Sequence, residues 1–164
     1  MFKASRDSDG ELFAMKMISK QQMGQDKNSM IEKEIEILKC LKHTNIVNLV
    51  DIKQTQNNWY LIFEYCELGD LDKYIQKFFK KNAKCLVPEP TAQKIVYSIA
   101  EAFKLLNEKK IVHRDLKLAN ILVNKDYHIK LADFGLAKLI DDNPIMCTYV
   151  GTPVTMAPEI LSHK

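Results

Sequence analysis

Apolar and polar residues alternate along residues 12–18, and a two-residue repeat is typical of a β-strand with one buried face. With this period a lysine shares one face with apolar neighbours, the four residues being Leu12, Ala14, Lys16 and Ile18. Residues 1–4 are also extended in pattern, and the sequence D-S-D-G at 7–10 is a turn signal between the two segments. Residues 1–20 are therefore predicted to form two strands.

Two longer segments carry apolar residues at the three- and four-residue spacing of amphipathic helices, one from about residue 27 to 41 and one over 91–110. A third helix is predicted from Gly69-Asp70 through residue 78, with Asp70 as its N-cap. The apolar stripes of the two longer helices consist of Ile31, Ile35, Leu38 and Leu41, and of Ile95, Ile99, Ala102, Phe103 and Leu106.

The remaining segments read as short strands and loops. Apolar runs of strand length occupy 45–51 and 59–65, and residues 121–123 and 128–131 flank a turn-like segment, which predicts a hairpin. A basic stretch is predicted to be a solvated loop, and it contains Lys80, Lys81 and Lys84. Residues from 132 onward show no periodicity. This order of strands, helix, strands and helices fits the α+β class.

Composition narrows the class of protein. A length of 164 residues fits one domain or a large part of one, and 46% hydrophobic with 27% charged residues is ordinary for a globular protein. The net charge of +3 is small and scattered, so neither a nucleic-acid partner nor a membrane surface is expected. No apolar run approaches the ~20 residues of a membrane span. The four cysteines form no C-x-x-C pair, which favours reduced thiols and a cytoplasmic or nuclear protein, and cytoplasmic is our expectation.

Four short motifs follow one another in the chain. They are F-A-M-K at 13–16, H-R-D-L-K-L-A-N at 113–120, D-F-G at 133–135 and A-P-E at 157–159. This ordered set resembles that of eukaryotic protein kinases over essentially the whole chain, residues 2–163. The resemblance implies a two-lobed α+β kinase fold over 1–164. It would comprise a small lobe (1–63) without the glycine-rich loop, a hinge (64–67) and part of the large lobe (68–164).

The resemblance implies an ATP-dependent kinase that uses Mg²⁺, because phosphoryl transfer relies on charge neutralisation and positioning. Lys16 would hold the ATP phosphates and would itself be held by Glu34. Asp133 and Asn120 would bind the metal through carboxylate and amide oxygens. Taken alone, Lys16 would be interpreted as a strand lysine whose head reaches solvent, and Glu34 as a solvated helix charge.

The segment H-R-D-L-K-L-A-N would carry the chemistry. Asp115 would accept the proton of the substrate hydroxyl or orient that hydroxyl, and Lys117 would place a positive charge near the transferred phosphate. Within the family, Lys117 and Thr152 accompany serine/threonine specificity, so protein serine and threonine side chains are the expected substrates. Without their partners, Asp115 and Asp133 could simply be turn residues.

The resemblance also assigns an adenine site and regulatory positions. Residues expected around the nucleoside are Ala14, Phe63, Glu64, Cys66, Asp70 and Leu122, with Phe63 as gatekeeper, and for Asp70 the N-cap role is an equal alternative. Thr148 is the expected activating phosphosite, Arg114 its phosphate partner and Thr152 a structural residue. The phosphate would come from an upstream kinase or from autophosphorylation. His43 and Asn45 match a turn after the first helix and are expected to be structural.

Parts of the family pattern are missing. There are five glycines, the nearest pair being Gly10 and Gly24, 14 positions apart, so no glycine-rich phosphate loop exists in this sequence. The helices expected after Glu159, and the arginine that pairs with that glutamate, are also missing. We therefore expect a fragment of a longer kinase, with little activity when expressed alone. The alternatives are a kinase-like nucleotide-binding or scaffolding module and a remnant that does not fold.

Overall fold

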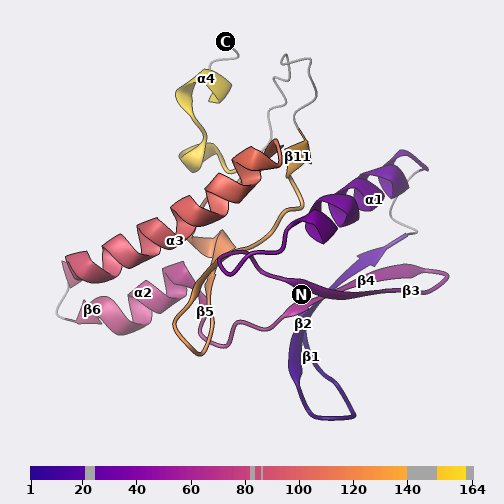
Figure 1. The fold of residues 1–164 in the computed structure, drawn as a ribbon, viewed down its shortest axis with the longest axis horizontal. Helices are drawn as coiled ribbons and strands as arrows, with labels where there is room; N and C mark the ends of the chain where they lie inside the picture. The colour runs from indigo at the N-terminus through magenta and orange to yellow at the C-terminus, as the bar shows by residue number, and fades with distance from the viewer. Residues whose placement is uncertain (21–24, 82–83, 86, 140–150, 162–164) are drawn as a thin grey trace.

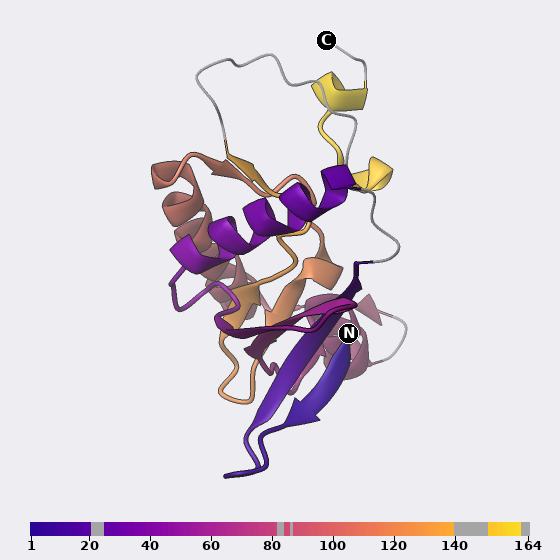
Figure 2. The same cartoon turned by 90° about the vertical axis from the view of Figure 1, so that its right-hand side faces the viewer.

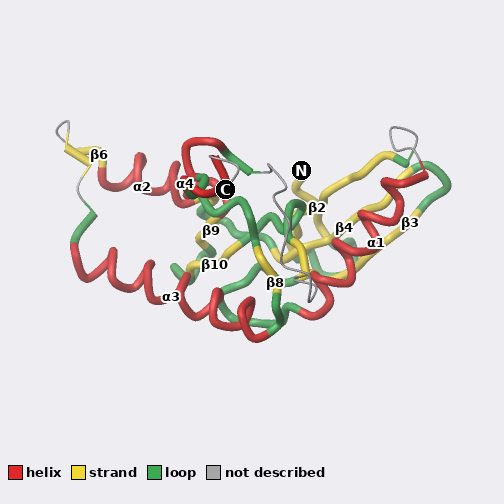
Figure 3. Tube along the Cα trace, turned by 90° about the horizontal axis from the view of Figure 1, so that it is seen from above, coloured by secondary structure: helices red, strands yellow, loops and turns green. Residues whose placement is uncertain are grey.

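The computed structural model describes residues 1–20, 25–81, 84–85, 87–139 and 151–161 of the chain (Figure 1). Seen from above, α1 lies with strands β2, β3 and β4 at one end of the molecule, while α2 and α3 lie at the other (Figure 3). Strands β8, β9 and β10 lie between these two groups (Figure 3). The observed α+β architecture thus has two halves, as the sequence predicts.

The first half is built on a four-stranded antiparallel sheet with the order β1-β2-β4-β3. Its strands are β1 (Phe2–Ser5), β2 (Leu12–Ser19), β3 (Leu49–Gln54) and β4 (Asn58–Glu64). The predicted strands at 1–4 and 12–18 are confirmed to within a residue or two at each end. In the β2–β4 register, Ala14 lies opposite Phe63 and Lys16 opposite Leu61. The lysine is therefore carried by an interior strand of the sheet.

Helix α1 (Gln25–Cys40) connects β2 to a turn that precedes β3. Its predicted apolar stripe is confirmed, because Ile31, Ile35 and Leu38 are all buried, as is Leu41 just after the helix. These side chains belong to one core cluster with Leu61 of β4. Burying such side chains is the main favourable contribution to folding, and here it fixes the orientation of the helix that carries Glu34.

The second half contains the longest helix and a hairpin. Its elements are β5 (Gly69–Asp70), α2 (Leu71–Phe79), β6 (Lys80–Lys81), β7 (Lys84–Cys85), α3 (Glu89–Glu108), β8 (Ile111–Val112), β9 (Ile121–Val123), β10 (Ile129–Leu131), β11 (Lys138–Leu139) and α4 (Pro158–Leu161). The predicted β9–β10 hairpin is confirmed, and β5 pairs with β9 on its other side. In α3 the predicted stripe points inward, with Ala102 and Leu106 buried and the remaining three residues partly buried against the core.

Three sequence-based expectations about these segments are wrong. The strand expected at 45–51 begins only at Leu49, because the residues before it bond to β10: Val47 N–H donates to Leu131 O over 2.9 Å. The basic segment expected to be a loop contains the antiparallel pair β6 and β7. The tail expected to be irregular contains β11, which pairs with β8, and the short helix α4.

Among the described residues, none of the helices has both the length and the apolar character that crossing a membrane requires.

Candidate active site

The predicted ion pair between β2 and α1 is present. Lys16 Nζ lies 2.6 Å from Glu34 Oε1, and both side chains are partly shielded from solvent. Gly135 lies beside this pair: a Cβ built on it would be 3.3 Å from Lys16 Nζ and 3.3 Å from Asp133 Oδ1. Three charged residues that are far apart in sequence are therefore gathered around one glycine, which leaves room for them because it has no side chain.

Asp133 follows β10 and is exposed, with a φ of 60° in the left-handed region that few residues other than glycine adopt. The next residue, Phe134, is 3% exposed, and its ring meets His113 edge-on with centroids 5.0 Å apart. Strained backbone of this kind persists where the surroundings fix it. Here the buried aromatic ring anchors the turn, so the carboxylate projects from a fixed position.

His113 joins the two motifs through both ring nitrogens. Its Nε2 lies 2.9 Å from Ala132 O, and its Nδ1 accepts from the Asp115 N–H at 3.3 Å. Since Nδ1 accepts, Nε2 carries the proton and donates to the carbonyl. Burial lowers the pKa of His113 below its ordinary value, which favours this neutral form. A neutral ring thus sets the spacing between Asp115 and the segment that leads to Asp133.

The carboxylate of Asp115 is buried and surrounded by donors. Thr152 Oγ1 donates to Oδ1 over 2.6 Å, while Lys117 Nζ and Asn120 Nδ2 each lie 2.8 Å from Oδ2. Burial raises the pKa of this group, but the hydrogen bonds outweigh burial and lower the pKa from 3.8 to about 2. Asp115 is therefore ionised throughout the physiological pH range.

Asn120 connects the Asp115 loop to the residues before Asp133. Its backbone carbonyl accepts from the Ala132 N–H at 2.8 Å, and its amide nitrogen donates to both the carbonyl and the carboxylate of Asp115. These bonds use the amide nitrogen, and the amide oxygen is the atom that a metal would take. In the described part of the chain, no cluster of three or more His, Cys, Asp or Glu forms a metal cage. This donor set fits Mg²⁺, which is commonly held by one or two protein oxygens together with substrate phosphates.

Most of the residues expected around the nucleoside lie on paired strands of two sheets. Phe63 is buried opposite Ala14, and Leu122 lies opposite Asp70 in the β5–β9 pair. Cys66 is buried, and burial, followed by the charge of Glu64, raises the pKa of its thiol to about 12. Its side chain is therefore a neutral packing group.

Asp70 has a clear structural role. Its Oδ1 accepts from the Lys73 backbone N–H at 2.9 Å, and its Oδ2 lies 2.7 Å from Lys73 Nζ. This is the N-cap expected for α2. The contact between Asp70 and the ribose, which the family resemblance implies, stays a prediction.

The regulatory positions are only partly described. Arg114 has a φ of 65°, and its Nε donates to Leu136 O over 2.5 Å, which ties it to the residue after Gly135. Thr148 lies outside the described residues. Thr152, which we expected to be structural, contacts Asp115 as noted above and also accepts from Lys117 Nζ at 2.8 Å.

Sequence reasoning overlooked Lys130 in β10. Its side chain is 10% exposed, and its Nζ lies 2.9 Å from Glu64 Oε1. A signal was present, because Lys130 is flanked by Ile129 and Leu131 in an apolar strand. The same kind of signal, a lysine among apolar strand residues, drew attention to Lys16.

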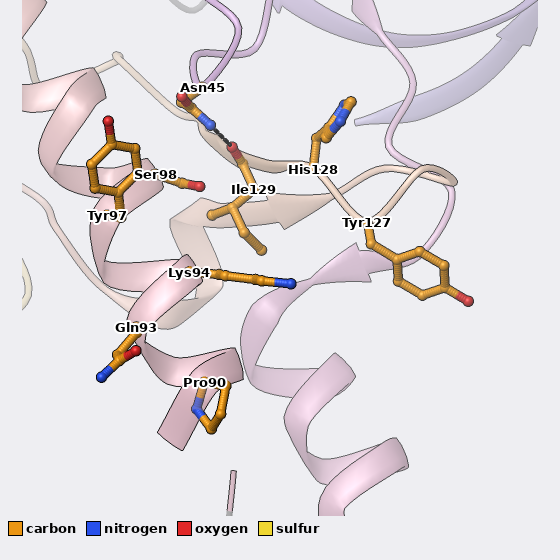
Figure 4. Close-up of a pocket in the computed structure, with 9 residues that line it drawn as sticks. All are labelled: Asn45, Pro90, Gln93, Lys94, Tyr97, Ser98, Tyr127, His128 and Ile129. Carbon is orange, nitrogen blue, oxygen red and sulfur yellow. Dashed lines mark hydrogen bonds between the residues drawn. The ribbon is translucent and has the colours of Figure 1, made fainter. Parts of the chain in front are cut away.

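Two surface cavities lie outside the cluster formed by Lys16, Asp115 and Asp133, although the lining of the second includes Phe13 of the first motif and Glu64. One of about 480 Å³ lies between α3 and the residues that lead into β10, and its lining includes Lys94, Tyr97 and Ile129 (Figure 4). Another of about 520 Å³ is lined by residues of the β2 start and the hinge, including Glu64. The lining residues of both cavities, all in the described part of the chain, include neither Lys16 nor Asp133. The candidate active site is thus identified by the contacts among its side chains and not by a cavity.

Comparison with known proteins identifies the family independently of the geometry. The family model described as "Protein kinase domain" matches residues 1–164. The serine/threonine-protein kinase unc-51 of Caenorhabditis elegans is 40% identical over 161 residues, which cover 90% of this chain and 18% of the relative. ULK1 of Homo sapiens is 38% identical (92% of this chain, 15% of the relative), and DCLK3 of Mus musculus is 42% identical (94% and 19%); both are named serine/threonine-protein kinases. The chain spans less than a fifth of the length of each of these relatives.

Proposed function

The chain belongs to the protein kinase family, and from that premise we propose that the protein transfers the γ-phosphate of ATP to serine and threonine hydroxyls of protein substrates. The observation that supports this most strongly is the network around Asp115, in which Thr152, Lys117 and Asn120 all contact one buried carboxylate. Such a network positions a hydroxyl-binding group without covalent chemistry, as phosphoryl transfer requires.

Lys16 is proposed to bind the ATP phosphates. Its ion pair with Glu34 holds the ammonium group in one place before the nucleotide arrives, so less reorganisation is needed on binding. The adenine ring is proposed to lie between Ala14 and Leu122 and to pair with the backbone of Glu64 and Cys66, with Phe63 behind it. This arrangement is supported by the β2–β4 and β5–β9 registers, which bring these strands to the hinge.

Asp133 and Asn120 are the residues proposed to hold Mg²⁺. When bound, the metal would supply charge neutralisation at the phosphates. The protein's own contribution is geometric: the hydrogen bond from Ala132 N–H to Asn120 O keeps the two metal-binding positions adjacent. Hard oxygen donors are the ligands that this cation prefers.

Asp115 is proposed to orient the substrate hydroxyl rather than to remove its proton early. A carboxylate with a pKa of about 2 is a weak base at neutral pH, but it is a strong hydrogen-bond acceptor that stays ionised. This suits a loose transition state in which little bond formation to the nucleophile has occurred. Lys117 would then place its positive charge beside the transferred phosphate.

The preference for serine and threonine is supported by the contact between Lys117 and Thr152. The 2.8 Å hydrogen bond between their side chains is the arrangement that the family resemblance leads one to expect in serine/threonine kinases. We propose Thr148 as the activating phosphosite and Arg114 as its partner, phosphorylated by another kinase or by the protein itself. We also propose a cytoplasmic location, which is supported by the cysteine spacing.

A second candidate function is nucleotide binding or scaffolding without transfer. Such a module would need only the Lys16–Glu34 pair beside Gly135, and not the network around Asp115. The division into a small lobe (1–63), a hinge (64–67) and a partial large lobe (68–164) is part of either proposal.

One experiment distinguishes the two candidates. The intact protein is incubated with radiolabelled ATP, Mg²⁺ and a mixture of serine, threonine and tyrosine peptides, and thermal shift with ATP is measured on the same sample. Label on serine and threonine peptides that is lost in Asp115→Asn supports the kinase. A thermal shift with Mg²⁺-ATP but no transfer supports the nucleotide-binding module, and label mainly on tyrosine contradicts the proposed specificity.

A further inference from the structure

Lys130 is a buried charged residue that has no role in the proposed reaction. It lies in the middle of β10 and is 10% exposed, whereas lysine is rarely buried unless it is paired. Its partner is Glu64, whose Oε1 lies 2.9 Å from Lys130 Nζ. Removing an ammonium group from water is unfavourable, so a lysine in such a place demands an explanation.

Glu64 joins three segments of the chain. It is the last residue of β4 and the first of the proposed hinge, and its Oε1 accepts both from Lys130 and from the Asn48 backbone N–H at 2.7 Å. The backbones of Asn48 and Glu64 are also bonded to each other, with Glu64 N–H donating to Asn48 O over 3.1 Å. We call Asn48, Glu64 and Lys130 the hinge joint.

The rest of β10 is bonded to the same region. Asn45 Nδ2 donates to Ile129 O over 2.9 Å (Figure 4), and Leu131 N–H donates to Asn45 O over 2.8 Å. Each residue of β10 therefore contacts either the turn that follows α1 or the hinge. β10 ends two residues before Asp133, and the turn follows α1, which carries Glu34. These contacts therefore connect the hinge to the segments that position Asp133 and Glu34.

We propose that Lys130 is a positioning residue that, through Glu64, fixes the hinge on β10 and thereby sets the affinity for the nucleotide. The effect on nucleotide affinity rests on the function proposed above, whereas the effect on the hinge does not. The other bonds between β10 and the turn use backbone atoms of β10, so substituting a side chain of β10 leaves them in place. The Lys130–Glu64 contact joins two side chains and can be removed selectively.

The first test is hydrogen exchange without nucleotide. In Lys130→Met, the backbone amides of Asn48 and Glu64, which are bonded within the hinge joint, should exchange at least tenfold faster, while the amides of α3 keep their rates. Lys125→Met is the matched control, because Lys125 is exposed in the turn before β10 and its side chain lies outside the hinge joint. Unchanged exchange at Asn48 and Glu64 in folded Lys130→Met would overturn the proposal.

The second test separates positioning from simple stability. In the intact protein, Lys130→Met and the nearly isosteric Glu64→Gln should each raise the KM for ATP three- to tenfold while kcat changes less than twofold. The double variant should be no worse than the poorer single variant, because both substitutions remove one contact. Additive effects, or a lower melting temperature with an unchanged KM in Glu64→Gln, would overturn the role in nucleotide affinity. A wild-type protein that does not bind ATP would refute the proposed function, and the exchange rates would still decide whether Lys130 fixes the hinge.

Discussion

Thr152 Oγ1 donates a 2.6 Å hydrogen bond to Asp115 Oδ1, and this bond joins residues 37 positions apart in the chain. Lys117 Nζ lies 2.8 Å from Thr152 Oγ1 and 2.8 Å from Asp115 Oδ2, so the three side chains contact one another in a closed triangle. The position of the proposed hydroxyl-binding carboxylate therefore depends on the segment that contains Thr152 as well as on its own loop.

The first prediction removes this contact. Thr152→Val keeps the shape of the side chain but deletes the hydroxyl, and a hydrogen bond to a charged group contributes about 1.5–3 kcal/mol. We expect kcat to fall about 10- to 100-fold. Thr152→Ser keeps the hydroxyl and should retain most of the activity. Steady-state kinetics on a serine or threonine peptide measure this, and a serine variant as slow as the valine variant would contradict the role of the hydroxyl.

The second prediction concerns Lys16. Lys16→Met removes the positive charge that Glu34 holds near Asp133. By comparison with the loss of one preorganised donor to a transition state, the cost is about 3 kcal/mol, or a 10²–10³-fold lower rate. Lys53→Met, on the exposed strand β3, is the control and should behave like wild type. Equal rates for Lys16→Met and the control would show that Lys16 does not act on the phosphates.

The third prediction concerns the two roles that the site assigns to different carboxylates. Asp115→Asn should reduce transfer about 10²–10⁴-fold, because Asp115 acts on the hydroxyl that is phosphorylated. Its affinity for ATP should stay within about twofold of wild type, since the nucleotide is proposed to contact Lys16 and Asp133 instead. Isothermal titration with ATP beside a transfer assay measures both quantities. A large loss of ATP affinity would mean that Asp115 contacts the nucleotide.

The pKa of Asp115 gives the fourth prediction. The folded protein lowers this pKa from 3.8 to about 2, so the ionised carboxylate contributes stability above about pH 4. That contribution is lost as the pH falls through about 2, because the proton then binds to the folded state as well. The difference in melting temperature between wild type and Asp115→Asn should therefore shrink as the pH is lowered from 5 to 2.5. A difference that stays constant over this range would contradict the lowered pKa.

Lys16 conflicts with its apolar strand neighbours, but this pattern alone left it as a lysine whose head reaches solvent. Its ion pair with Glu34 was predicted correctly from the family resemblance. Lys130 shows the same conflict, but β10 has only three residues, which is too short for its period to be recognised. The pairing with Glu64 spans 66 positions, and local patterns carry no information about such contacts.

Other failures also have tertiary causes. The segment 45–47 was expected to continue a strand, yet the backbones of Asn45 and Val47 bond to Leu131 of β10 rather than to a neighbouring strand in the four-stranded sheet. Helix periods were predicted well because α1 and α3 bury continuous stripes. The network around Asp115 could be expected only from the family resemblance, because Thr152 and Asp115 are brought together by folding alone.

The last prediction tests whether the backbone next to Thr152 is essential. Gly151 has a φ of 132°, a conformation that residues with a side chain rarely adopt. A Cβ built there would lie 2.6 Å from the backbone oxygen of Arg114, closer than non-bonded atoms normally approach. Gly151→Ala therefore forces the backbone to move, and the neighbouring Thr152 should lose its bond to Asp115. We expect kcat to fall about 10- to 100-fold, as in Thr152→Val.

Gly10→Ala is the matched control, because Gly10 also has a positive φ, of 72°, but nothing lies within 4 Å of the added Cβ. It should lose roughly 1 kcal/mol of stability through backbone strain and keep full activity. If Gly151 acts through Thr152, the double variant Gly151→Ala with Thr152→Val should be no slower than Thr152→Val alone. A folded Gly151→Ala protein with wild-type kcat would show that the segment can shift without disturbing Asp115, and an additive loss in the double variant would mean that Gly151 positions Arg114 independently.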